Sequence, residues 1–282
     1  MKTCNSLSGG KTSSYIAANY PADYDVFALV RTDDKNCIYP DKKVRQMVED
    51  RIQKPFIGTL EEDAIIKTML DLEQFIGRRI TWVSGKTFDE IIIRKDKKYL
   101  PNVTQRFCTT EMKLQPIFDW WLNNVGEPIE TRIGYRANEK SRAKTMLNKT
   151  NKDGLSEYKT IVGKRKTLNK WATIGWQKPV FPLIDNNIFK DQIVKYWENK
   201  PVEFAYMNNC IGCFHRNEVL LKFMSELHPN KFNWFIEAEQ DTGSNVRTFK
   251  NGINYKQIKN SFSQIRLFED DFNECDSGYC GL

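Results

Sequence analysis

Residues 8–13, SGGKTS, combine two glycines, a lysine and three hydroxyl side chains close to the start of the chain. Glycine lets backbone N–H groups approach a phosphate without a Cβ in the way, and the hydroxyls donate further hydrogen bonds. A helix that begins directly after such a loop adds the partial positive charge of its N-terminus. The stretch therefore predicts a phosphate-binding loop made by Ser8, Gly9, Gly10, Lys11, Thr12 and Ser13.

Two better-known phosphate loops do not fit these residues. A Walker A loop, G-x-x-x-x-G-K-[ST], matches Gly10, Lys11 and Thr12, but Asn5 stands where its first glycine belongs. The Rossmann pattern G-x-G-x-x-G fails at the same place. The pattern that fits is S-G-G-x-x-S, and the structural alternative is a plain tight turn between a strand and a helix.

Four of the seven cysteines form two close pairs towards the end of the chain. Cys210 and Cys213 have the spacing CxxC, and Cys275 and Cys280 lie on a glycine-containing turn. Thiolates at these spacings can face one ion or cluster, and four of them suit Zn²⁺ or a [4Fe–4S] cluster. The two pairs therefore predict a four-thiolate metal site, with Cys108 as an alternative ligand. A redox dithiol at one or both pairs is the other interpretation.

Positive charge gathers in one segment. The chain has a formal net charge of +7, and residues 136–170 contain eleven Lys and Arg against three Asp and Glu. A concentrated basic segment favours an anionic partner, either substrate phosphates or a nucleic acid. A solvated, lysine-rich loop is the alternative interpretation.

Strand-like and helical apolar patterns alternate through the first 200 residues. Strands are expected at the start of the chain and within 26–30, 78–84, 130–139 and 176–186, and helices within 12–19, 41–53, 88–95, 110–124 and 189–198. This alternation predicts an α/β fold with a mostly parallel sheet flanked by helices. Residues 144–176 lack clear periodicity and are expected to leave the sheet. We expect a nucleotide-binding domain at 1–200 and a cysteine-containing region, packed on it, at 201–282.

Four further motifs give the chain a family resemblance. "LVRTDD" (29–34), "RFCTTEMKLQP" (106–116), "GYRANEKSRA" (134–143) and "VFPLIDNNIFKDQIVKYW" (180–197) follow SGGxxS in the order found in one superfamily. The chain resembles the PP-loop (adenine nucleotide alpha hydrolase-like) superfamily and, within it, the phosphoadenosine phosphosulfate (PAPS) reductase-like family. The resemblance covers residues 1–200 and implies an adenine nucleotide, ATP or PAPS, bound with Mg²⁺.

The resemblance also implies roles for individual residues. Arginine makes planar, charge-assisted contacts with phosphate or sulfate, which suits the motif at 134–143. Besides residues 8–13, the nucleotide-binding residues implied are Thr32, Asp33, Gly134, Arg136 and Arg142. The candidate catalytic residues are Lys11, Arg136, Arg142 and Cys280.

Two departures from the family pattern bear on the activity. Reductases of this family usually carry a degraded loop, so the intact SGGxxS is more similar to members that cleave ATP between its α and β phosphates. The Glu-Cys-Gly-Leu ending of the reductases is divided here between Glu274-Cys275 and Cys280-Gly281-Leu282. We therefore expect an enzyme that adenylylates a substrate and releases pyrophosphate, in sulfur transfer or nucleic-acid modification.

Two alternative functions follow from the same residues. The first is reduction of PAPS or adenylylsulfate with Cys280 as the nucleophile, which would need a thiol reductant protein as a partner. The second is a non-catalytic protein that binds nucleotide or nucleic acid and is held together by structural zinc. No apolar run reaches the roughly 20 residues of a membrane-spanning helix, so we expect a cytoplasmic protein with no membrane partner.

Overall fold

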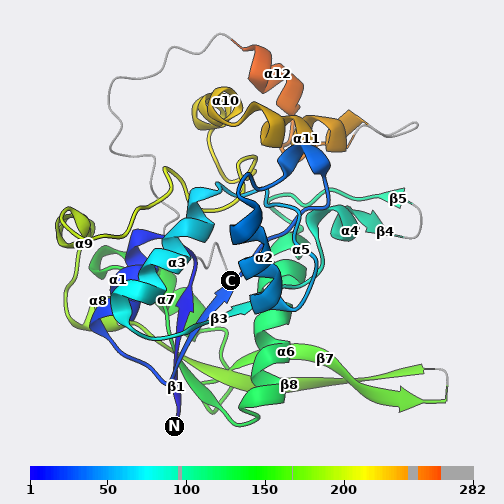
Figure 1. Ribbon diagram of the computed structural model, residues 1–282. Helices are drawn as coiled ribbons and strands as arrows, with labels where there is room; N and C mark the ends of the chain where they lie inside the picture. The colour runs from blue at the N-terminus through cyan, green and yellow to red at the C-terminus, as the bar shows by residue number, and fades with distance from the viewer. Residues whose placement is uncertain (95–96, 167, 241–246, 262–282) are drawn as a thin grey trace.

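The computed structural model describes residues 1–94, 97–166, 168–240 and 247–261. Its centre is a six-stranded sheet of order β3-β2-β1-β6-β8-β7 (Figure 1). The strands are β1 (Thr3–Leu7), β2 (Tyr24–Ala28), β3 (Ile80–Val83), β6 (Ile129–Arg132), β7 (Ser156–Arg165) and β8 (Leu168–Val180). All neighbours pair in parallel except β7 and β8. The predicted α/β fold with a mostly parallel sheet flanked by helices is confirmed.

Helices fill the connections between the strands. The longer ones in the first 200 residues are α1 (Lys11–Asn19), α2 (Lys42–Ile52), α3 (Ala64–Ile76), α6 (Gln115–Asn124), α7 (Lys140–Leu147) and α9 (Lys190–Trp197). The shorter ones are α4 (Phe88–Ile92), α5 (Phe107–Thr109), the π-helical turn η2 (Thr110–Leu114) and α8 (Pro182–Asp185). A separate two-stranded ribbon joins β4 (Ile93–Arg94) to β5 (Lys97–Lys98).

Alternate residues of β2 pack on opposite sides of the sheet, as the period of two along a strand requires. Phe27 belongs to the core shared with α1, α2, α3 and α9. Val26 and Ala28 belong to the core that contains Phe118 and Trp121 of α6. The central strands are therefore covered on both faces, which explains their continuous apolar sequence.

The last described helices share a core with the first 200 residues. These helices are α10 (Glu218–Leu227), α11 (Pro229–Gln240) and α12 (Tyr255–Asn260). Leu221, Phe235 and Tyr255 from them are buried with Val30 and Phe88 in one cluster. The segment that follows residue 200 is thus packed against the ends of β2 and α4.

The prediction that residues 144–176 leave the sheet was wrong for most of that segment. Residues 156–165 form β7, and β8 begins at residue 168 and pairs with both β7 and β6. The outer part of this hairpin is exposed on both faces, so no alternation of apolar and polar residues marks it as a strand. Pairing along the backbone, rather than burial, defines it.

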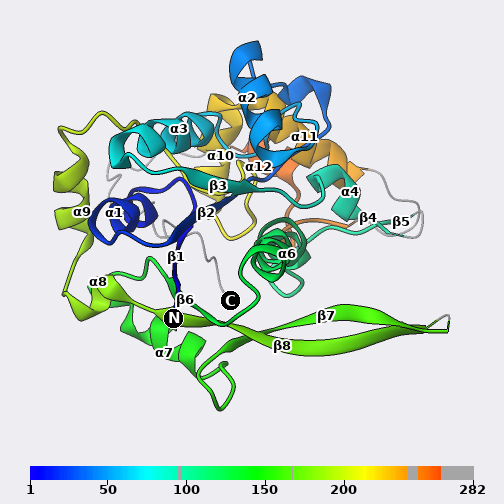
Figure 2. The ribbon, with the colours of Figure 1, turned by 60° about the horizontal axis from the view of Figure 1, so that its bottom comes forward.

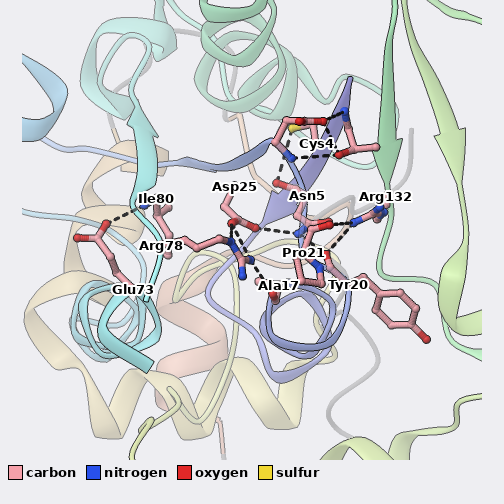
Figure 3. A network of polar contacts seen from close by, with 12 residues as sticks. Cys4, Asn5, Ala17, Tyr20, Pro21, Asp25, Glu73, Arg78, Ile80 and Arg132 are labelled. Atoms are coloured by element: carbon pink, nitrogen blue, oxygen red, sulfur yellow. Dashed lines mark hydrogen bonds and ion pairs between the residues drawn. The ribbon is translucent and has the colours of Figure 1, made fainter. Parts of the chain in front are cut away.

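A buried polar network ties α1 to the sheet (Figure 3). Asn5 on β1 donates from Nδ2 to Asp25 Oδ1 on β2 at 2.8 Å and to the carbonyl of Tyr20 at 3.0 Å. Arg78 donates to Asp25 Oδ2 at 2.9 Å and, from the same nitrogen, to the carbonyl of Ala17 at 2.8 Å. Both carbonyls lie at the C-terminal end of α1, so this network sets the direction in which its N-terminus points.

We predict that Asp25→Ala lowers the free energy of unfolding by about 3 kcal/mol, because it leaves the buried Asn5 amide and the Arg78 guanidinium without their acceptor. Asp71→Ala is the control, since it removes an exposed ion pair with Lys67 worth less than about 1 kcal/mol. Urea unfolding of the two variants measures the difference. Equal losses would show that the network does not anchor the helix.

Candidate phosphate site and cysteine cavity

The predicted phosphate loop lies where the order of strands changes direction. From β1 the chain continues to β2 and β3 on one side, whereas β6 and β8 lie on the other side of β1. In open parallel sheets, ligands bind outside the carboxyl ends of the strands at such a switch point. Residues 8–10 follow the carboxyl end of β1, and Gly134 follows that of β6. A Cβ on Gly134 would lie 3.3 Å from Cγ2 of Thr12, so the two loops are in contact.

The loop has the backbone geometry of an anion site. Gly9 has φ = +79°, and a Cβ at this position would lie 2.6 Å from Cγ2 of Ile65 on α3. Gly10 is the N-cap of α1, and its residue type offers no side chain to cap the first turn. Inside the loop, Ser13 Oγ accepts from the backbone N–H of Ser8 at 3.2 Å and donates to the carbonyl of Gly10 at 3.1 Å. The uncapped N–H groups of the first turn are therefore suited to a phosphate.

The start of α1 is also held from outside the loop. Trp197 on α9 donates from Nε1 to the carbonyl of Lys11 at 3.0 Å. Its ring packs against Phe75 of α3 and against Phe204. Lys11 itself is partly exposed, which leaves its ammonium group available beside the loop.

One carboxylate holds both predicted arginines. Glu139 Oε2 accepts from the backbone N–H of Arg136 at 2.9 Å and from Arg136 Nε at 3.0 Å. Glu139 Oε1 pairs with Arg142 Nη1, and the Arg142 guanidinium lies over the ring of Tyr135, 4.4 Å from its centroid. Two cations against one anion leave the group with a net positive charge next to Gly134. Sequence reasoning had not assigned a role to Glu139, although it lies inside the motif at 134–143.

Thr32 and Asp33 are bonded to α4 rather than to the loop after β1. Thr32 Oγ1 and the backbone N–H of Asp33 both donate to Asp89 Oδ2 at 2.7 Å. Asp33 Oδ2 accepts from Thr87 Oγ1 at 2.7 Å, and Trp234 Nε1 donates to Asp89 Oδ1 at 2.8 Å. These contacts join the end of β2 to α4 and α11.

A larger cleft lies at this end of the sheet. Its volume is about 650 Å³, within the range of small-molecule sites. Asp33, Lys54, Trp82 and Asp119 are among its lining residues. Burial lowers the pKa of Lys54, with a further contribution from the charge of Arg31, and burial raises the pKa of Asp119. The sequence offered no signal for this cleft because its walls come from widely separated segments.

Three of the seven cysteines line one cavity of about 50 Å³. Cys210 and Cys213 belong to the CxxC turn, and Cys108 lies on α5. Burial raises the pKa of the Cys210 thiol well above its usual value, and that of Cys108 in the same direction. The Cys108 and Cys210 thiols are therefore protonated at neutral pH unless a cation replaces the proton.

The cysteine cavity and the phosphate loop share neighbours. Thr109 and Lys113 line the cysteine cavity and also a smaller cavity of about 20 Å³ beside Ser8. Lys113 belongs to η2, a widened helical turn of a kind often found at functional sites, and pairs with the buried Glu61 at 3.0 Å. Lys113 therefore lines both the cysteine cavity and the cavity beside Ser8.

His215 also lines the cysteine cavity. Its pKa falls to about 4 because of its partial burial and the nearby charges of Arg106, Arg216 and Lys250. The imidazole is therefore neutral at pH 7.

Within the described part of the chain, no three His, Cys, Asp or Glu side chains form a group that could hold a metal ion. Cys275 and Cys280, the other two predicted ligands, lie outside the described residues.

Comparison of the chain with protein-family models, with curated proteins and with solved structures found no match. A search for membrane spans among the described residues found no helix of sufficient length and apolarity.

We predict that Gly9→Ala lowers the free energy of unfolding by about 3 kcal/mol, and Gly77→Ala by about 1 kcal/mol. Both glycines have positive φ, but a Cβ on Gly9 collides with Ile65, whereas nothing lies within 4 Å of a Cβ on Gly77. Denaturant unfolding of the two variants isolates the collision from the shared backbone strain. Similar losses would mean that the loop moves freely away from α3.

Proposed function

We propose that this protein is an ATP-using enzyme of the PAPS reductase-like branch of the PP-loop superfamily. It cleaves ATP between the α and β phosphates, transfers AMP to an acceptor and releases pyrophosphate. The observation that carries the proposal is the meeting of two loops at one switch point, the uncapped first turn of α1 and the segment with Arg136 and Arg142 after β6.

The proposed roles follow from charge. The pyrophosphate part of ATP binds the N–H groups of residues 9–13, where the helix dipole favours negative charge. As the acceptor attacks the α phosphorus, the bond to the bridging oxygen breaks and negative charge accumulates on the departing pyrophosphate. Lys11, Arg136 and Arg142 stabilise that charge, and Glu139 keeps the two arginines in place. Mg²⁺ would enter bound to the nucleotide phosphates and neutralise part of their charge.

The cysteines form a second part of the proposal. Cys210 and Cys213 would supply two ligands and Cys275 and Cys280 the other two, with Cys108, which lines the same cavity as Cys210 and Cys213, as the alternative. Such a thiolate set suits either Zn²⁺ or a [4Fe–4S] cluster. Zn²⁺ would hold the C-terminal region together, whereas a [4Fe–4S] cluster would supply electrons or take part in sulfur chemistry.

With ATP and Mg²⁺, we expect the protein to bind nucleotide and to form AMP and pyrophosphate when an acceptor is present. Arg136→Ala and Arg142→Ala should each weaken ATP binding by about 10- to 100-fold, because each removes a charge-assisted contact. Arg79→Ala is the matched control, since Arg79 is exposed and directly precedes β3, at the opposite end of the parallel strands from the loop after β1, and should leave binding unchanged.

Chromatography of labelled nucleotide and titration calorimetry provide the measurements. Formation of ADP and inorganic phosphate would contradict cleavage at the α–β bond. Release of sulfite from PAPS, without turnover of ATP, would instead establish the reductase alternative.

Metal analysis and a visible absorption spectrum test the thiolate site. We expect Cys210→Ser and Cys213→Ser each to lose most of the bound zinc or iron, whereas the control Cys4→Ser retains it, because Cys4 is buried in the separate core beneath α6. Visible absorption identifies the cluster, and a colourless zinc protein identifies the structural metal. Metal loss in Cys108→Ser with full retention in Cys280→Ser would contradict the assignment to the two cysteine pairs and make Cys108 a ligand. Full retention in both Cys210→Ser and Cys213→Ser would exclude a metal at the CxxC turn.

A further inference from the structure

The hairpin of β7 and β8 is an arm that projects from the edge of the sheet. The two strands pair from Ser156 opposite Gln177 to Arg165 opposite Leu168, and both ribbon views show the outer part extending beyond the neighbouring helices (Figures 1 and 2). At the inner end, the ring of Tyr158 stacks on Phe118 of α6, with centroids 4.6 Å apart. The arm is thus anchored at its base and free of packing further out.

The arm is strongly basic. Residues 156–180 contain six Lys and Arg against one acidic residue, Glu157, which lies at the base of the arm. Of the basic residues, Lys159, Lys164, Lys166 and Lys170 are exposed. An arm of this composition attracts a polyanion and repels a second copy of itself.

One face of the arm carries an exposed aromatic ring beside a lysine. Ile161 is opposite Trp171, and Lys159 is opposite Thr173, so all four side chains share a face. Trp171 is 56% exposed and Ile161 is 46% exposed. The Lys159 ammonium lies 5.6 Å from the centroid of the Trp171 ring. A run of charges that only faced water would have no reason to carry these apolar side chains.

We propose that this arm binds a nucleic acid with unpaired bases. The lysines contact the phosphates, and a base stacks on the indole of Trp171, as in sites for single-stranded nucleic acid that combine a basic track with aromatic platforms. A duplex fits less well because its bases are already stacked and offer no free face to the ring. An acidic protein surface would match the charge but would not require an exposed indole. Binding of the nucleic acid to the arm does not depend on the proposed function. Only the further step, in which the bound polymer is the acceptor that receives AMP, rests on it.

Fluorescence anisotropy with labelled oligonucleotides of about 20 nucleotides, longer than one stacking site, tests the proposal. The probes are single-stranded DNA, single-stranded RNA and the corresponding duplex, each titrated between about 50 and about 200 mM salt. We expect both single strands to bind more tightly than the duplex, and the tighter of the two identifies the natural polymer. Tighter binding of the duplex would overturn the proposal.

Two sets of variants separate stacking from charge. Trp171→Ala should weaken binding of the single strand by about 10-fold or more, and Trp171→Phe should restore most of it, since one stacked base contributes about 1–3 kcal/mol. Lys159, Lys164 and Lys170 changed together to alanine should lower the slope of log affinity against log salt by about 2. The matched control changes Lys42, Lys43 and Lys256, which are exposed elsewhere.

Equal effects of the two lysine triples, or no effect of Trp171→Ala, would show that only diffuse charge is involved and would overturn the proposal.

The experiment also separates this inference from the proposed function. Arg136→Ala should block AMP formation and leave oligonucleotide binding intact. Binding to the arm without any ATP cleavage in the wild-type protein would refute the enzyme alone, and AMP formation without oligonucleotide binding would refute the arm alone.

Discussion

The bond between Asp25 and Arg78, with Asn5 beside it, is the interaction on which the arrangement of the phosphate site depends. Asp25 is buried on the central strand pair, so its charge requires both partners. Arg78 and Asn5 use their remaining donors for carbonyls at the end of α1. One buried charge therefore orients the whole helix, and the N–H groups at the opposite end of α1 face the carboxyl edge of the sheet.

The same edge receives the loops after β2 and β6 because all these strands run in parallel. Parallel order explains why Gly134 touches Thr12 although more than a hundred residues separate them. Arg136, Glu139 and Arg142 follow β6 in one segment, so the local i,i+3 ion pairs of Glu139 lie close to the loop after β1. The positive charge that a phosphate requires is thus assembled from two distant segments.

The helices after residue 217 that the structure describes contribute much of one core and position the CxxC turn. They bury aromatic rings against the ends of β2 and α4, and this packing brings the CxxC turn next to Cys108. Thr109 and Lys113, on the turn of helix that follows Cys108, also line the cavity beside Ser8. Residues of one helical turn therefore connect the cysteine cavity with the loop after β1.

The sequence by itself determined the α/β class and a helix at 12–19 after a glycine-containing loop, which the structure has at Lys11–Asn19, because strand and helix periodicity and glycine preferences are local properties. It also indicated Arg136 and Arg142 through one motif. Only the tertiary structure decided that Gly134 lies against Thr12 and that Cys108 shares a cavity with Cys210 and Cys213. These features depend on packing between residues far apart in the chain. A local sequence pattern does not specify which distant segment will pack against it.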